Sequence, residues 1–413
     1  MASSRLWYIA VKTETTVATA VKPTNFLRYK EWDMNPGLEI LENDPIQNQR
    51  RKSINAVKWK ESCEGSFKCD LDPNDAVFFL KAALGTNTPA DISSLTDGSV
   101  YKHTITMANA LPALTIEQGK GNLSDATSNL QNYQVDRAFG AMVDSFTLAW
   151  SDGIVEMEAK MIAHGIFQKA NLITNVVAWS SKKLYLDNVE WLVATTDTVN
   201  IFDATPKNET DAIAAITASD KSITIATLGA AYTTANRAKV ELVPQTPSYS
   251  TAAKVMSFRH VGFQFGADLT AAASATETNI EDRTFEYQNQ LEARYGSLRP
   301  GPSVIAPKGA IATLKFTKYF ENRADLDKFL NIQEQGCIIT ITNDEIVSAT
   351  DTNSAKYTVK ILLNKLIYKS YEMPTGTDEL YAASVEASAF YSEADGKAIT
   401  IEVTNSKIGT LYD

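Results

Sequence analysis

Apolar and polar residues alternate along most of the chain, which is the pattern of strands buried on one face. The clearest case spans residues 143–165, where Ser151-Asp152-Gly153 supplies a turn between two alternating runs. This pattern predicts a hairpin with one dry and one wet face. The dry face carries Phe146, Leu148, Trp150, Val155, Met157, Ala159 and Met161. Further strands are predicted by the same alternation at 357–361, 385–389 and 399–403.

Helical periodicity is rare and short. Asp72 is placed to cap a helix, Pro73 suits its first position, and Gly85 ends it. Apolar residues recur at helical spacing between Pro73 and Gly85, so a helix is predicted there. A second short helix is predicted over 323–330, with Asn322 as its cap. In a strand-rich chain, such isolated helices are expected to cover one opening of a sandwich or barrel.

The same series of elements occurs twice: a strand, a long loop, a strand and a short helix. In the first copy the elements are strand 26–32, loop 33–55, strand 56–71 and the helix from Pro73. In the second copy they are strand 284–291, loop 294–309, strand 310–320 and helix 323–330. The repetition predicts two β modules, 1–168 and 247–413, each with one short α-helix.

Residues 169–246, between the two modules, have a pattern of their own. Short apolar runs separated by polar turns predict strands at 183–193, 197–203, 212–218, 222–227 and 238–243. They indicate a small, barrel-like β domain that folds separately from the modules. The fold class expected is therefore mainly β: two β-sandwich or barrel modules, each with one short α-helix, and a small inserted β domain.

Length and charge narrow the class of protein. The chain has 413 residues, with 49 acidic and 39 basic side chains and a formal net charge of −10. This balance does not favour tight non-specific binding to nucleic acid or to anionic membranes. No apolar run approaches the roughly 20 residues of a membrane helix, and no signal peptide is expected. Cys63, Cys69 and Cys337 are expected to be reduced thiols of a cytosolic protein.

The histidines and acidic residues of the chain do not form a pattern typical of a catalytic or metal-binding site. His103, His164 and His260 lack the spacing of metal ligands. Glu156 and Glu158 share one strand face about 7 Å apart, a separation that glycosidases can use. Adjacent carboxylates are also common on exposed strands, so catalysis is not favoured. The sequence predicts a non-enzymatic protein with no metal and no cofactor.

Several segments carry a resemblance to one protein family. They are residues 65–71, 101–106 and 111–119, the helix from Pro73, the hairpin 143–165, and residues 309–320 and 357–373. Together they resemble the tail tube proteins of long-tailed, siphovirus-type bacteriophages, in the form whose subunit carries the tube domain twice. The resemblance implies a structural virion protein, a major tail tube subunit.

The resemblance also implies how the subunits assemble. Strands of neighbouring subunits would close a β-barrel, which has no exposed sheet edge, around a channel for double-stranded DNA during ejection. Two modules per chain imply a homotrimeric, pseudo-hexameric ring, with a homohexamer as the alternative. Stacked rings would form the tube. The other implied partners are the tape measure, tail terminator and distal tail proteins, with no membrane partner. The subunit would be made in the host bacterial cytoplasm and reside in the virion tail.

Two sets of residues are expected to carry this function. The wet strand faces supply the candidates for the channel lining: Glu64, Ser66, Lys68, Glu156, Glu158, Lys160, Lys315, Thr317, Lys360 and Glu386. The loop 33–55 is expected to stack one ring on the next through Leu38, Ile40, Leu41 and Ile46. Its length far exceeds the usual connection of about 4–6 residues.

Two other classes remain open from the residues alone. A different virion tail protein, such as a distal tail or sheath component, would share this composition. A carbohydrate-binding β-sandwich would also share the strand pattern, although it would need aromatic platforms and a secretion signal. The inserted segment 169–246 is expected on the outside of a tube, because an insert in the channel would obstruct DNA.

Overall fold

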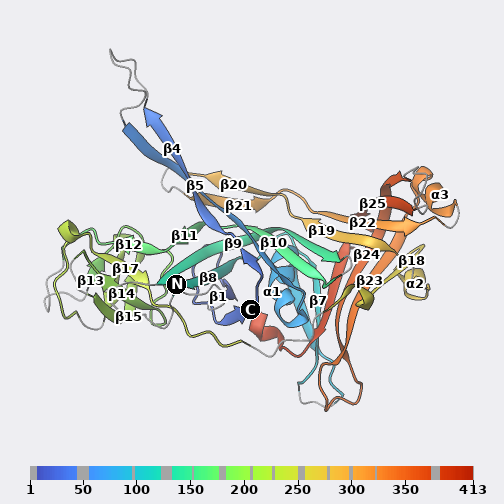
Figure 1. Ribbon diagram of the computed structural model, residues 1–413, viewed down its shortest axis with the longest axis horizontal. Coiled ribbons are helices and arrows are strands. Elements are labelled where there is room, and N and C mark those ends of the chain that lie inside the picture. Colours follow the sequence, from blue (N-terminus) through green and yellow to red (C-terminus); the bar gives the residue numbers. More distant parts are fainter. Residues whose placement is uncertain are drawn as a thin grey trace.

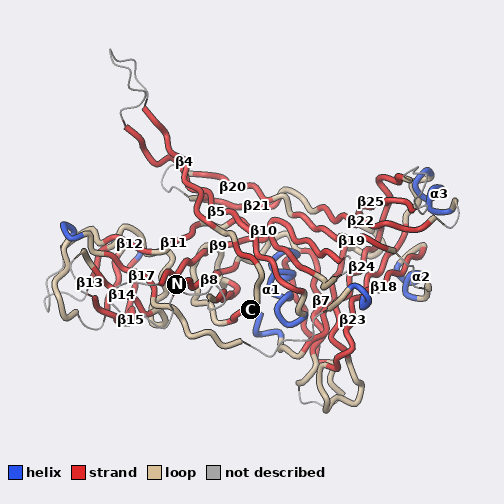
Figure 2. The backbone as a smooth tube through the Cα atoms, viewed as in Figure 1, coloured by secondary structure: helices blue, strands red, loops and turns tan. Residues whose placement is uncertain are grey.

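Strands dominate the computed structural model of this chain, and helices are few and short, as Figures 1 and 2 show. The structure describes residues 7–43, 55–94, 98–121, 133–150, 153–175, 183–204, 208–225, 228–249, 256–276, 280–296, 301–320, 323–373 and 382–412. The chain forms a first half, an inserted segment and a second half in this order. The predicted class, mainly β, is confirmed.

The first half comprises residues 7–167. Its elements are β1 (Tyr8–Thr13), β2 (Asn25–Leu27), β3 (Glu31–Trp32), β4 (Asn35–Asn43), β5 (Asn55–Asp70), α1 (Pro73–Leu84), β6 (Gly85–Asp91), β7 (Tyr101–Met107), β8 (Leu114–Gly121), β9 (Tyr133–Trp150), β10 (Glu156–Ile162) and β11 (Gly165–Phe167). The hairpin predicted over 143–165 is formed by β9 and β10. Every residue of its predicted dry face is buried.

The inserted segment carries β12 (Lys169–Asn171), β13 (Lys183–Tyr185), β14 (Thr198–Phe202), β15 (Asn208–Thr217), β16 (Ser222–Ile225) and β17 (Lys239–Leu242). These strands form one six-stranded sheet in the order β12-β17-β14-β15-β16-β13. The strand predicted over 183–193 is wrong beyond β13. Its apolar residues Leu186, Val189, Trp191 and Leu192 pack into the core of the segment without continuing the strand.

The second half comprises residues 256–412. Its elements are β18 (Val261–Gly266), α2 (Leu269–Ala273), β19 (Glu281–Gln288), β20 (Leu291–Tyr295), β21 (Pro302–Pro307), β22 (Ile311–Tyr319), α3 (Ala324–Leu330), β23 (Gln335–Ile346), β24 (Lys356–Glu372), β25 (Ala382–Phe390) and β26 (Ile399–Asn405). Helix α3 starts after Arg323, and the predicted cap Asn322 lies outside the described residues. Helix α2 was not predicted from the sequence.

The prediction of two long irregular loops is wrong, because both segments form β-hairpins. In the first half, β4 pairs with the N-terminal part of β5 along its whole length. In the second half, β20 pairs with β21. Each half therefore has a hairpin arm, here called the first arm (β4 with residues 55–64) and the second arm (β20 with β21). Figure 1 shows the first arm projecting from the body.

One hydrogen-bonded network joins the two halves. Strand β9 pairs with β19, so the strands β3-β5-β10-β9-β19-β22-β25-β24 follow one another in a single sheet. The N-terminal half of β24 also pairs with β23 and β26, and β26 pairs with β7. The halves thus meet along two pairs of strands, β9–β19 and β26–β7, rather than as two separate sandwiches.

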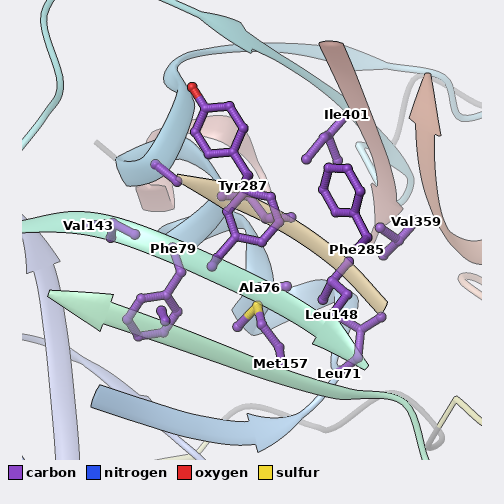
Figure 3. Close-up of a cluster of buried hydrophobic side chains, with 14 of the residues drawn as sticks. Leu71, Ala76, Phe79, Val143, Leu148, Met157, Phe285, Tyr287, Val359 and Ile401 are labelled. Atoms are coloured by element: carbon purple, nitrogen blue, oxygen red, sulfur yellow. The ribbon is translucent and has the colours of Figure 1, made fainter. Parts of the chain in front are cut away.

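The hydrophobic core is shared in the same way. Phe146 of β9 lies 5.8 Å from Phe285 and 5.5 Å from Tyr287, measured between ring centroids. Figure 3 shows these second-half rings among side chains of the first half, with Val359 and Ile401 beside them. Burial of this apolar surface stabilises both halves together.

Helix α1 lies inside this core. Its predicted bounds and its cap are confirmed, since Asp72 accepts a hydrogen bond from the backbone N–H of Asn74. Almost all of its residues are buried, so it is enclosed on all sides rather than covering an opening with one face. Phe79 stacks on Phe67 of β5 at 4.4 Å, and Phe78 packs edge-on against Tyr412 at 4.7 Å.

Candidate functional site

The joined sheet presents one long polar face. On β5, β10, β9, β19, β22 and β25, buried residues alternate with polar residues, and the pairing registers place polar residues opposite one another. One row across the sheet is Lys68, Glu158, Thr147, Glu286, Thr313 and Ser388. The next row is Asp70, Glu156, Ala149, Thr284, Lys315 and Glu386. We call this surface the polar face.

Nine of the ten candidates for the channel lining lie on the polar face. They are Glu64, Ser66 and Lys68 of β5, Glu156, Glu158 and Lys160 of β10, Lys315 and Thr317 of β22, and Glu386 of β25. Lys360 lies apart from them. It belongs to the N-terminal half of β24, where its cross-strand neighbours are Thr340 of β23 and Glu402 of β26.

Carboxylates outnumber lysines on the polar face. The strand positions just named carry the six carboxylates Glu64, Asp70, Glu156, Glu158, Glu286 and Glu386, and the three lysines Lys68, Lys160 and Lys315. Lys30, which pairs with Asp70 and Glu156 at one corner, is a fourth lysine. Lys315 lies 3.3 Å from Glu386, so part of the charge is neutralised within the face. The remaining excess is negative.

One corner of the polar face holds a cluster of ion pairs. Lys30 Nζ lies 2.5 Å from Asp70 and 2.8 Å from Glu156, while Lys68 Nζ lies 3.0 Å from Glu156. Hydrogen bonds from Lys30 and Lys68 lower the pKa of Glu156. Bonds to Asp70 and Glu156 raise the pKa of Lys30 to about 12. Glu156 is therefore fixed in place, whereas Glu158 forms no ion pair with any residue that the structure describes.

The first arm carries exposed apolar side chains although it projects from the body. Leu38, Ile40, Leu41, Val57 and Trp59 are each more than half exposed. Ile46 lies outside the described residues. A two-stranded hairpin is marginal on its own in water, and an exposed apolar patch marks a contact surface.

The second arm, in contrast, is covered by the first half of its own chain. Its Ile305 and Leu291 pack with Leu111 and Met142 of the first half, in a small separate core. Nδ1 of His164 lies 3.0 Å from the carbonyl oxygen of Pro302 at the start of this arm.

A groove of about 810 Å³ runs along β3, at the end of the joined sheet. It is lined by Trp7, Leu27, Arg28, Tyr29, Lys30, Glu31, Trp32, Asp33, Ser66, Gln118 and Tyr249. Nε1 of Trp7, Nε1 of Trp32 and Oε1 of Gln118 are buried and have no hydrogen-bond partner within the described part of the chain.

His103 and His260 make hydrogen bonds within the fold, which indicates structural roles. His103 is buried and hydrogen-bonds to Asn87, Asn405 and the carbonyl oxygen of Lys407, and burial lowers its pKa. His260 accepts a hydrogen bond from the backbone N–H of Ser257. Among the residues that the structure describes, no cluster of His, Cys, Asp and Glu side chains could hold a metal ion.

Comparison with known proteins decides the family. Residues 7–404 match the family described as phage tail tube protein. This chain belongs to the phage tail tube family. No curated protein matches. A solved structure that is similar is the SPP1 tail tube, from solid-state NMR and cryo-EM. It has 15% sequence identity and a TM-score of 0.26, and the match covers 38% of this chain and 82% of the SPP1 chain.

Membership of the phage tail tube family makes this chain a structural component of a phage tail, which self-assembles and associates with other tail proteins. Of the protein classes that the sequence left open, the family match supports a tail tube protein. The family is a structural one rather than a family of enzymes. Within the described residues, no helix is long and apolar enough to span a membrane.

Some residues of the polar face were not predicted from the sequence. Asp70, Thr147, Glu286 and Gln288 share the face with the predicted candidates but were not singled out. The signal was available for β19, where Phe285 and Tyr287 alternate with Thr284, Glu286 and Gln288. The pairing of β19 with β9, which brings Glu286 beside Thr147, has no signal in the sequence because it joins distant segments.

Proposed function

We propose that this chain is the major tail tube subunit, that its copies form rings that stack into a tube, and that the polar face lines the channel for DNA. The observation that carries the proposal is the polar face itself, which crosses both halves of the chain in one antiparallel sheet. Rotating copies of such a sheet about an axis extends it into a closed barrel. Two halves per chain support a ring of three chains.

The charge of the polar face suits a channel that conducts DNA without holding it. Each lysine that contacts a phosphate adds a salt-dependent attraction, so a lysine-rich channel would retain the DNA. Here carboxylates exceed lysines, and small polar residues such as Thr147, Thr313 and Ser388 lie between them. The DNA can then slide along the face.

The inserted segment is proposed to lie on the outer surface of the tube. It follows β11, which pairs with the N-terminal half of β9, and so leaves the body beside a sheet other than the polar one. In Figure 1 the inserted segment lies at the end of the molecule opposite α3.

The first arm is proposed to be covered by another copy of the chain. Its exposed apolar residues would otherwise remain in water, and stable obligate interfaces of this kind bury roughly 2,000–5,000 Å². Contact between successive rings, as expected from the sequence, stays a prediction.

Electron microscopy of the purified protein tests the proposal. We expect rings or tubes at high protein concentration. The double variant Leu41→Asp, Trp59→Asp should remain folded, because both side chains are exposed, but should form no tubes. The matched control Ile173→Asp changes an apolar residue of similar exposure in the inserted segment and should assemble normally. A wild-type protein that stays monomeric in sedimentation would refute the function.

A further inference from the structure

Residues 405–412 fold back onto the first half of the chain, and we call them the closing segment. The segment starts at Asn405, the last residue of β26, and ends in a 3₁₀ turn over Gly409–Tyr412. Its contacts include β1, α1, β6 and β7, which all belong to the first half. In Figure 1 the segment lies beside α1. The last described part of the second half therefore packs on elements from the beginning of the chain.

Tyr412 anchors the closing segment in the core. Its side chain is 0% exposed and packs edge-on against Phe78 of α1 at 4.7 Å. Its hydroxyl donates a hydrogen bond to the carbonyl oxygen of Asn74 at 2.7 Å. Its own carbonyl oxygen accepts hydrogen bonds from Oγ1 of Thr13 at 2.7 Å and from Nζ of Lys81 at 2.8 Å. These partners define a single docked position, because buried polar groups need to be paired.

The beginning of the closing segment is bonded to the first turn of α1. The side-chain amide of Asn405 donates to the carbonyl oxygen of Pro73 at 2.8 Å and to the hydroxyl of Tyr412 at 2.9 Å. The backbone N–H and the hydroxyl of Ser406 donate to Oδ1 of Asn74, at 3.4 Å and 3.3 Å. Docking of the segment thus pairs polar groups at the start of the helix.

Helix α1 lies between the closing segment and the back of the polar face. Phe78 of the helix contacts Tyr412, and the adjacent Phe79 stacks on Phe67 of β5 at 4.4 Å. Lys68, the next residue of β5, lies on the polar face. Since almost every residue of α1 is buried, the side of the helix toward Tyr412 would be open to water without the closing segment.

The closing segment is also made long after the elements that it covers. Roughly 320 residues separate the end of α1 from Asn405, which at about 5–20 residues per second corresponds to about 15–60 s of synthesis. During this time Phe78 and the first turn of α1 lack the partners that the closing segment supplies. The support behind β5 is therefore incomplete until residues 405–412 arrive.

We propose that the closing segment controls when a subunit can assemble. It docks last, and its docking fixes α1 behind β5, which makes the polar face able to join other copies. A chain whose closing segment has not docked stays unassembled, so incomplete chains do not enter the tube. The inference rests on the proposed tube function and goes further, because it assigns the step that makes a subunit competent for assembly.

Gly409→Val tests the control of assembly, because it blocks docking without changing the polar face. An added Cβ at this position would collide with the ring of Pro89 in β6. We expect no tubes from Gly409→Val in electron microscopy, whereas Thr410→Val, at the adjacent exposed position, should assemble normally. Ile201→Ala removes buried side-chain volume from the core of the inserted segment and should also form tubes. This second control separates the effect of docking from a general loss of stability.

Amide hydrogen exchange tests the link through α1. In the unassembled Leu41→Asp, Trp59→Asp subunit, adding Gly409→Val should speed exchange in α1 and in residues 66–70 at least about tenfold, because both become part of a unit that opens locally. Exchange in β14 and β17 of the inserted segment should not change. Pulse labelling during refolding of the wild type tests the order of events. Strands β9 and β10 should be protected first, and α1 should be protected later, together with residues 405–412.

Each measurement can overturn the inference separately from the tube function. Normal tubes from Gly409→Val, unchanged exchange in α1, or protection of α1 before residues 405–412 would each refute control by the closing segment and leave the tube function standing. The refolding experiment uses the wild type and so decides the order of docking even if Gly409→Val does not fold. A wild-type protein that forms no rings or tubes would remove both the tube function and the inference.

Discussion

Arg137 of β9 binds Asp197 of the inserted segment through two hydrogen bonds, at 2.5 Å and 3.0 Å, with both side chains 1% exposed. Arg137 also pairs with Glu117 of β8 at 2.6 Å. This buried cluster ties the inserted segment to the first half. The segment has its own six-stranded sheet, but its core also contains Tyr133, Val135 and Phe139 of β9.

Removing the positive charge from this cluster should destabilise the protein strongly. Arg137→Leu leaves Glu117 and Asp197 buried without a cation, and breaking a buried ion pair in this way costs about 3–5 kcal/mol. Urea unfolding of the purified subunit measures the loss. Arg259→Leu breaks an exposed pair with Asp344 and should cost about 1 kcal/mol or less. Equal effects of the two substitutions would contradict a structural role for the cluster.

Substitution of Asn289 should also destabilise the protein, by less and for a different reason. Its side-chain amide donates to the carbonyl oxygens of Ala83 and Val143, at 2.8 Å and 2.9 Å, and so ties the second half to α1 and β9. Asn289→Ala leaves these buried carbonyls without that donor, which should cost about 1–3 kcal/mol in urea unfolding. Asn353→Ala, at an exposed position, should change the stability little. A loss from Asn289→Ala no larger than that of the control would argue against this link between the halves.

Local rules account for the parts of the fold that could be predicted. The cap at Asp72, with Pro73 after it, determines where α1 begins, and Gly85 has the positive φ that ends it. Alternation in the hairpin of β9 and β10 assigns its two faces, since a shift by one residue would turn every apolar side chain toward water. The same alternation placed Glu156, Glu158 and Lys160 together correctly on one face.

The two arms and the pairing of β9 with β19 were not predicted from the sequence, for physical reasons. In the first arm, Pro36 and Gly37 read as loop residues, and the register shift between Glu39 and Ile40 breaks the alternation. Exposure of both faces of a hairpin also removes the periodic signal of burial. Lys360 lies apart from the other candidates because the N-terminal half of β24 pairs with β23 and β26, whereas its C-terminal half pairs with β25.

Stability should depend on pH through Asp75 of α1. Burial, and next the nearby charge of Asp72, raise the pKa of Asp75 to about 7, above the value of about 3.9 in an unfolded chain. The folded state then holds a proton that the unfolded state loses, so this contribution is full below about pH 4 and is lost as the pH rises through 7. It amounts to at most roughly 4 kcal/mol.

Asp75→Asn tests this pH dependence. The amide keeps an oxygen for the backbone N–H of Arg28 but carries no charge. Relative to the wild type, the variant should gain stability at pH 8 and little at pH 4, as measured by urea unfolding at both values. Asp344→Asn, at an exposed position, should leave the dependence unchanged. Parallel curves for Asp75→Asn and the wild type would show that Asp75 is charged in the folded protein.

The charge of the polar face should govern the rate of DNA passage. Glu158 and Glu286 lie in one row of the face, on either side of Thr147, and each substitution Glu→Lys replaces a negative charge with a positive one. Glu158 is a better choice than Glu156, whose replacement by lysine would also disrupt the ion pairs with Lys30 and Lys68. Both side chains are partly exposed, and surface substitutions usually cost within about 0.5 kcal/mol, so folding and tube formation should survive.

Phage particles assembled with Glu158→Lys, Glu286→Lys should eject DNA more slowly than wild-type particles at low salt, because the added lysines attract phosphates. The difference should shrink as the salt concentration rises. Glu158→Gln, Glu286→Gln removes charge without adding lysine and should slow ejection less. Asp187→Lys, Glu393→Lys makes the same charge change at exposed positions on other elements and should leave the rate unchanged. If the polar-face lysine variant ejects DNA at the normal rate at low salt, this face does not line the channel.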